Sequence, residues 1–107
     1  MKAKIFYWKS MEKWYTNVLY HEKLPTIEDI KNDYVELPIT IDVENEEDLA
    51  KIFHALNIEE NPMGTKENQE WIVKNGLRHT SMSVGDIACI NEKYFVCLSV
   101  GWKELTS

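Results

Sequence analysis

The 107-residue chain contains few of the residues and runs that mark secreted or membrane proteins. Its two cysteines are too few for the disulfide framework that is typical of small secreted domains. No apolar run approaches the roughly 18–20 residues that a bilayer-spanning helix needs. The N-terminal segment MKAKIFYWKS carries charges but has no apolar stretch of signal-peptide length. We therefore expect a cytoplasmic protein with reduced thiols and no membrane contact.

The spacings that mark metal and catalytic sites are also missing. His21, His54 and His79 lie far apart, whereas structural metal sites bring their ligands in closely spaced pairs. There is no C-x-x-C, and the hydroxyl-bearing segment 79–81 lacks the glycine-framed turn of a nucleophilic serine. Asp86 is a candidate acid or base, but a turn carboxylate that binds backbone amides is the favoured interpretation. We expect no enzyme activity, no cofactor and no metal.

Cys89 and Cys97 fall on the two arms of a predicted C-terminal hairpin and are candidate cross-strand neighbours. Free cysteine is among the most frequently buried residue types, so two packed thiols are the favoured interpretation. A redox pair or a disulfide is the alternative.

Local patterns predict the strands. Residues 34–43 alternate strictly between apolar and polar types, as does a strand with one buried face, and Pro38 places that strand at a sheet edge or a bulge. The β-prone runs 3–8 and 14–21 predict an N-terminal hairpin. Residues 86–90 and 94–100 predict a closing hairpin across residues 91–93.

Capping signals predict the helices. Thr26, with Asp29 three positions later, predicts a short helix that ends near Lys31. Asn45 is expected to cap a second helix, with acids 46–48 in its first turn. Its predicted buried stripe consists of Leu49, Ile52, Phe53 and Leu56. A third helix is expected over residues 66–74, capped by Thr65 and ended by Asn75-Gly76.

These elements predict one domain, residues 1–107, of the α+β class. We expect an antiparallel sheet of about five strands, formed by two hairpins and one edge strand and covered by two to three short helices.

The charges are distributed unevenly along the chain. Residues 26–60 hold eleven of the eighteen acidic residues and only two basic ones, so this window carries a net charge of −9 against −6 for the whole chain. A dense negative zone repels nucleic acid and attracts basic surfaces. A solvated face is the alternative interpretation. The candidate partner-binding residues are Asp42, Glu44, Glu46, Glu47, Asp48, Glu59 and Glu60.

The first 20 residues interleave lysines with aromatic residues. Rings beside lysines on a sheet can stack bases and contact phosphates, as single-strand binders do. The modest charge of this segment argues against direct nucleic-acid binding, and exposed rings anchor protein contacts equally well. Trp8, Trp14 and Tyr15 are secondary candidates for a partner contact.

Two segments resemble a known group of proteins. NPMGTKENQEWI at residues 61–72 and HTSMSVGDIACINEKYFVCLSVGWKEL at residues 79–105 are similar to small YodL-like proteins of phages, plasmids and conjugative elements. In that group an SMSVGD segment precedes a hairpin that ends in a Gly-aromatic pair, here Gly101-Trp102. The resemblance covers roughly the last 45 residues and carries no catalytic residues to this chain.

The resemblance implies a mobile-element protein in the cytoplasm of a bacterial host. Small acidic proteins of such elements are often inhibitors of host defence, including anti-CRISPR and antirestriction proteins. Cas9-type effectors hold their heteroduplex in a basic channel, which an acidic surface can occupy. We therefore expect a non-enzymatic inhibitor that binds such a channel; the alternatives are a single-strand-binding accessory protein and an interaction module without inhibitory function.

Overall fold

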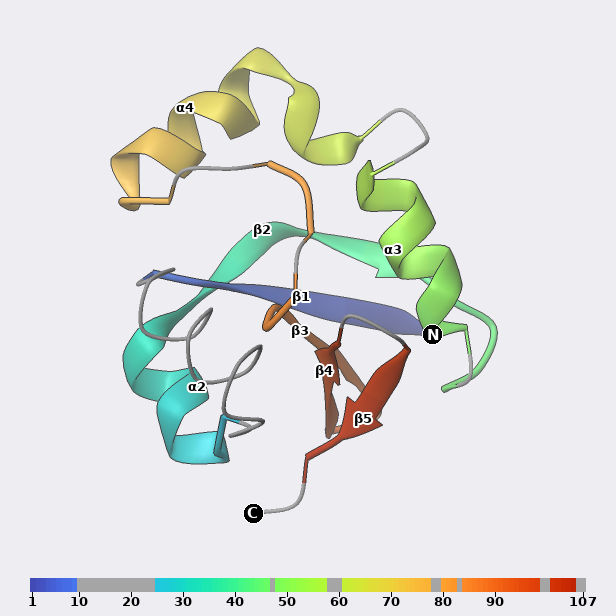
Figure 1. The fold of residues 1–107 in the computed structure, drawn as a ribbon. Helices are drawn as coiled ribbons and strands as arrows, with labels where there is room; N and C mark the ends of the chain where they lie inside the picture. The colour runs from blue at the N-terminus through green and yellow to red at the C-terminus, as the bar shows by residue number, and fades with distance from the viewer. Residues whose placement is uncertain are drawn as a thin grey trace.

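A five-stranded antiparallel sheet organises the chain in the computed structural model (Figure 1). The structure describes residues 1–9, 25–46, 48–57, 61–77, 80–82, 84–98 and 101–105. Along the sheet the strands lie in the order β2-β1-β3-β4-β5, so β1 is an inner strand and β2 and β5 form the edges. The elements in chain order are β1 (Lys2–Trp8), α2 (Ile27–Asp33), β2 (Tyr34–Asp42), α3 (Leu49–Asn57), the 3₁₀ turn η2 (Pro62–Gly64), α4 (Lys66–Lys74), β3 (Ile87–Ile90), β4 (Lys93–Cys97) and β5 (Trp102–Glu104). The predicted α+β class and antiparallel sheet are confirmed.

Each face of the sheet has its own apolar cluster. On one face, side chains of all the inner strands pack against Ile52 and Leu56 of α3 and Ile72 of α4. On the other face, Trp8, Tyr34 and Val96 pack against Ile30 of α2. Figure 1 accordingly shows α3 and α4 on one side of the sheet and α2 on the opposite side. Successive residues of a strand point to opposite faces, which is how β1 contributes to both clusters.

Strand β2 confirms the predicted alternation and the predicted role of Pro38. Lys4 of β1 pairs with Thr40, but Phe6 pairs with Glu36, so the register shifts beside Pro38. A bulge at an edge strand accommodates a residue that has no N–H to donate. β2 has two extra residues at this bulge, and an even number leaves the alternation of its side chains unchanged. The apolar side chains of β2 and of the residue after it therefore all belong to or pack against the first cluster: Val35, Leu37, Ile39, Ile41 and Val43.

Two of the three predicted helices begin at their predicted caps. Thr26 and Asp29 form the predicted capping box of α2, although the helix continues to Asp33. The Thr65 hydroxyl accepts a hydrogen bond from the Asn68 N–H at the start of α4. Gly76, with φ 74°, ends α4 in the left-handed conformation that glycine adopts most easily.

The prediction for α3 is wrong in two respects. The helix begins at Leu49, so Asn45 does not cap it, and the acids 46–48 precede its first turn. Instead, the backbone carbonyl oxygen of Asn45 accepts a hydrogen bond from the Asp48 N–H (3.2 Å) in a turn before the helix. Phe53 was expected in the core but is 38% exposed, whereas Ile52 and Leu56 are fully buried.

The predicted C-terminal hairpin forms, with a tighter turn and with a second arm, Lys93–Cys97, that is shorter than the predicted 94–100. Ile90 pairs with Lys93, so the turn contains two residues, Asn91 and Glu92, both with positive φ. This is the geometry of the primed turns that suit the twist of a hairpin. Strand β5, which pairs with β4, was not predicted. The second arm of the predicted N-terminal hairpin, residues 14–21, lies outside the described residues, while β1 pairs with β2 and β3.

Gly85 and Asp86, which lead into β3, form a buried corner that also contacts β1 and β2. The Trp8 N–H donates to the Asp86 Oδ1 (3.4 Å), and the Tyr34 hydroxyl donates to the Gly85 carbonyl oxygen. Tyr7 donates to the Thr80 carbonyl oxygen (2.8 Å). Burial, and secondarily the Asp86 carboxylate, raises the pKa of both tyrosines above 10.0, so both hydroxyls remain protonated donors.

Gly85 is required in this corner for two reasons. Its φ of 98° is one that side chains with a Cβ rarely adopt, and an added Cβ would lie 3.3 Å from the Trp8 ring. The predicted structural interpretation of Gly85-Asp86 agrees with this geometry, although the amide that Asp86 binds belongs to β1.

The packing of α3 can be tested with neighbouring substitutions. Leu56→Ala should lower the free energy of unfolding by about 2–5 kcal/mol, because it leaves a cavity in the first cluster. Phe53→Ala removes more atoms but should cost less, since the Phe53 ring is partly solvated. Chemical denaturation of both variants measures the difference. A larger loss for Phe53→Ala would show that α3 is rotated relative to this packing.

Candidate functional site

Four of the acidic residues predicted to bind a partner, Asp42, Glu44, Glu46 and Asp48, lie at the end of β2 and in the connection to α3. We refer to residues 42–46 and 48 as the acidic loop. The Asp42 side chain is 81% exposed and lies 3.8 Å from the Lys2 Nζ. Glu44 is also exposed, and its N–H donates to the Asp48 Oδ2 (2.9 Å). The loop therefore gathers four of the predicted carboxylates at one end of the sheet.

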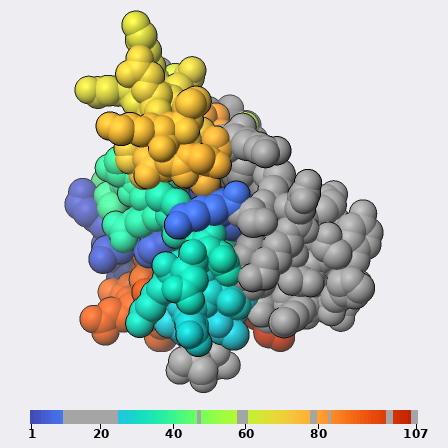
Figure 2. Space-filling model, turned by 90° about the vertical axis from the view of Figure 1, so that its left-hand side faces the viewer, coloured from blue at the N-terminus to red at the C-terminus, as the bar shows by residue number. Residues whose placement is uncertain are grey.

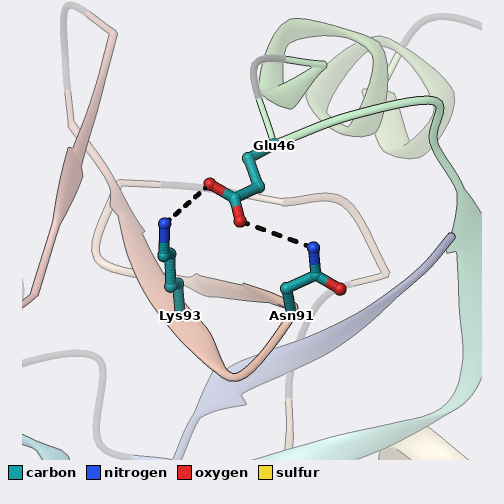
Figure 3. Close-up of polar contacts among 3 residues, drawn as sticks. All are labelled: Glu46, Asn91 and Lys93. Carbon is teal, nitrogen blue, oxygen red and sulfur yellow. Dashed lines mark hydrogen bonds and ion pairs between the residues drawn. The ribbon is translucent and has the colours of Figure 1, made fainter.

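Glu46 has a structural contact within this loop. Its Oε2 lies 3.0 Å from the Lys93 Nζ, and its Oε1 accepts a longer hydrogen bond from the Asn91 side chain (3.4 Å; Figure 3). The hydrogen bond to Lys93 lowers the pKa of Glu46, and the same contact raises the pKa of Lys93. This interaction joins the acidic loop to the β3–β4 hairpin, although Asn91 and Lys93 lie 45 and 47 residues after Glu46 in the sequence.

The remaining predicted contact residues divide into two groups. Trp8 is 2% exposed and packs in the second cluster, so the expectation of a surface ring at this position is wrong. Trp8 lies in the core because alternate residues of β1 point to the same face, and Phe6 and Trp8 face α2. Outside the described residues lie Trp14, Tyr15, Glu47, Glu59 and Glu60.

A groove on the sheet was not predicted from the sequence. It lies on the face that carries α2 and has a volume of about 580 Å³. Its polar lining includes Lys2 and Lys4 of β1 and Lys31 of α2, and its apolar lining includes the Phe6 and Tyr94 rings. These two rings are tilted by 54° with their centroids 6.0 Å apart.

One signal in the sequence could have indicated this groove. Lys2, Lys4 and Phe6 are separated by two positions each, so a strand points them to one face. What the sequence does not provide is the pairing that brings β4, and with it Tyr94, to the same face. Figure 2 shows the start of β1 (dark blue), the β3–β4 turn (orange) and α2 (cyan) on one side of the molecule.

The cysteines are two buried free thiols, as predicted. They are not cross-strand neighbours, because Cys89 pairs with Tyr94 in the hairpin register. Burial raises the pKa of Cys89 and raises that of Cys97 to about 12. Both thiols are therefore protonated at neutral pH and are weak nucleophiles.

Within the described ranges, no group of three or more His, Cys, Asp or Glu side chains could hold a metal ion. Likewise, no helix there has the length and apolar character to cross a membrane. Asp86 is fully buried in the corner before β3, where its carboxylate accepts a hydrogen bond from the Trp8 N–H and links β3 to β1.

Comparison with known proteins gives one informative similarity. The chain is 37% identical over 59 residues to "Uncharacterized protein R785" of Acanthamoeba polyphaga mimivirus. The match covers 55% of this chain and 54% of that protein, so the chain spans about half the length of the relative it matches. No protein-family model and no solved structure matches the chain.

The contact between Glu46 and Lys93 predicts a pH-dependent contribution to stability. Because the pKa of Glu46 is lowered from 4.5 in the folded protein, its contribution is present above pH 4.5 and is lost as the pH falls through the lowered value. Glu46→Gln should therefore be less stable than the parent at neutral pH, and the difference should shrink on acidification. Denaturation at several pH values measures this dependence.

Glu70→Gln, in an exposed position of α4, removes the same charge and serves as the control. Its stability should follow that of the parent across the same pH range. If Glu46→Gln behaves in the same way, the contact does not stabilise the acidic loop.

Proposed function

We propose that the protein is a non-enzymatic inhibitor, encoded by a mobile element, of a nucleic-acid-handling host defence complex. In this proposal it acts in the cytoplasm of a bacterial host and is of the anti-CRISPR or antirestriction type. The acidic loop occupies a basic channel in the target, such as the guide or target channel of a Cas9-type effector, and thereby competes with nucleic acid.

The exposure of Asp42 and Glu44 on one end of the sheet is the observation that supports this proposal. The Asp42 side chain is 81% exposed, and its carboxylate lies 3.8 Å from the ammonium group of Lys2, which is itself 72% exposed. Such a contact is weak in water, so lysines and arginines of a partner can replace it at low cost. Glu44 projects from the same short connection and adds to the local negative potential.

Glu46 has a different function within the same proposal. Its contact with Lys93 partly neutralises the loop and holds the connection against the hairpin. A loop held in one conformation loses less conformational freedom on binding. Glu46 therefore positions the acidic loop, while Asp42 and Glu44 supply the charge that attracts the partner.

The test is a double charge reversal, Asp42→Lys with Glu44→Lys, in an inhibition assay with Cas9-type and restriction complexes. Each close charge pair at an interface typically contributes enough for a loss of about tenfold or more, so the double variant should inhibit at least about a hundredfold less well. Inhibition by the parent should also weaken as salt is added. The parent should block loading of guide or target and leave a preassembled cleavage step unaffected.

A matched control is Glu70→Lys with Glu104→Lys, which makes the same charge change at two other exposed positions. It should inhibit like the parent. Thermal unfolding of both variants establishes that they remain folded. Full inhibition by the folded Asp42→Lys/Glu44→Lys variant contradicts the proposed contact, and a parent that inhibits none of these complexes contradicts the proposed function.

A further inference from the structure

The face of the sheet that carries α2 is only partly covered among the described residues. Near α2, side chains such as Trp8, Tyr34 and Val96 form the second apolar cluster. Toward the start of β1, the same face opens into the groove between Lys4, Lys31 and Tyr94. A volume of about 580 Å³ is in the range of small-molecule sites, about 300–1,000 Å³.

Aromatic and charged side chains line the same groove. The Phe6 and Tyr94 rings and the Cys89 thiol form an apolar floor that comes from three adjacent strands. Both rings are partly exposed, and their tilted arrangement at 6.0 Å leaves ring surface for a third planar group. Stacking on such rings is tolerant of the identity of the base.

Charged groups of both signs surround this floor. Lys2 and Lys4 line the groove from β1 and Lys31 lines it from α2, so its cations come from two elements. Lysine ammonium groups bind phosphate as point charges. Glu36 and Glu92 also line the groove, and carboxylates accept hydrogen bonds from ribose hydroxyls in nucleotide sites.

From this combination we propose that the groove binds a nucleotide, with its base on the Phe6 and Tyr94 rings and its phosphate at Lys4 and the neighbouring lysines. The two carboxylates bind the ribose hydroxyls. The free mononucleotide is favoured over a single-stranded polymer, because the chain carries a net charge of −6 and a long polyanion is repelled. This proposal does not depend on the inhibitory function.

Isothermal titration of the full chain with AMP, GMP, CMP and UMP tests the proposal. At least one should bind with a saturating isotherm. Adenosine, which lacks the phosphate, and ribose 5-phosphate, which lacks the base, should each bind about tenfold or more weakly than the matching nucleotide, since each loses one of the two contacts. A short oligo(dT) tests the alternative ligand. If oligo(dT) binds more tightly than every mononucleotide, the groove is a site for single-stranded nucleic acid and not for a free nucleotide.

Two variants identify the site. Lys4→Glu changes an exposed side chain in the groove and should weaken binding of the nucleotide, or of oligo(dT), by about tenfold or more. Lys51→Glu makes the same charge change at an exposed position of α3, away from the groove lining, and should retain binding within about twofold. Tyr94→Leu keeps an apolar side chain but removes a ring, and should weaken binding of the nucleotide more than that of ribose 5-phosphate.

Three results would overturn the proposal. These are the absence of binding for every nucleotide and for oligo(dT) at millimolar concentration, equal losses in Lys4→Glu and Lys51→Glu, and equal affinity for nucleotides and for ribose 5-phosphate. Inhibition assays with Lys4→Glu separate the two proposals, because loss of nucleotide binding with full inhibition leaves the acidic loop as the inhibitory contact.

Discussion

The buried contact between Asp86 and the backbone of β1 is the constraint on which the rest of the structure depends. Asp86 is fully buried, and such a carboxylate is tolerated only when its oxygens have hydrogen-bond donors. The Trp8 N–H supplies one donor, and Gly85 provides both the space against the Trp8 ring and the turn that leads into β3. Gly85 and Asp86 thus form a structural corner that holds β3 beside β1.

The corner has consequences for both candidate surfaces. Once β3 is fixed beside β1, the β3–β4 turn lies where Lys93 can contact Glu46, so the acidic loop is positioned by the hairpin. The same pairing brings Tyr94 opposite Cys89 and near Phe6, which creates the floor of the groove. Acidic loop and groove are adjacent, and Lys2 contacts the first and lines the second.

The sequence predicted what depends on neighbours along the chain. The alternation before and after Pro38, the capping box of α2 and the end of α4 at Gly76 are local patterns, and all three are confirmed. Contacts such as that of Tyr34 with Gly85, 51 residues apart, follow from sheet pairing and have no local pattern. Phe53 was wrongly predicted to be buried, because helical spacing identifies the apolar face of α3 but not how much of that face the sheet covers. The groove was missed because it requires the register of three strands.

The central functional claim is that carboxylates of the acidic loop contact lysines of a basic channel. Zero-length carbodiimide cross-linking of the complex with a Cas9-type effector, followed by mass spectrometry, tests it directly because this reagent joins only carboxylates and amines in contact. The account predicts cross-links from Asp42 and Glu44 to lysines that line the nucleic-acid channel, and their loss when guide or target is bound first. Cross-links confined to acids elsewhere, such as Glu67 and Glu70 of α4, would contradict it.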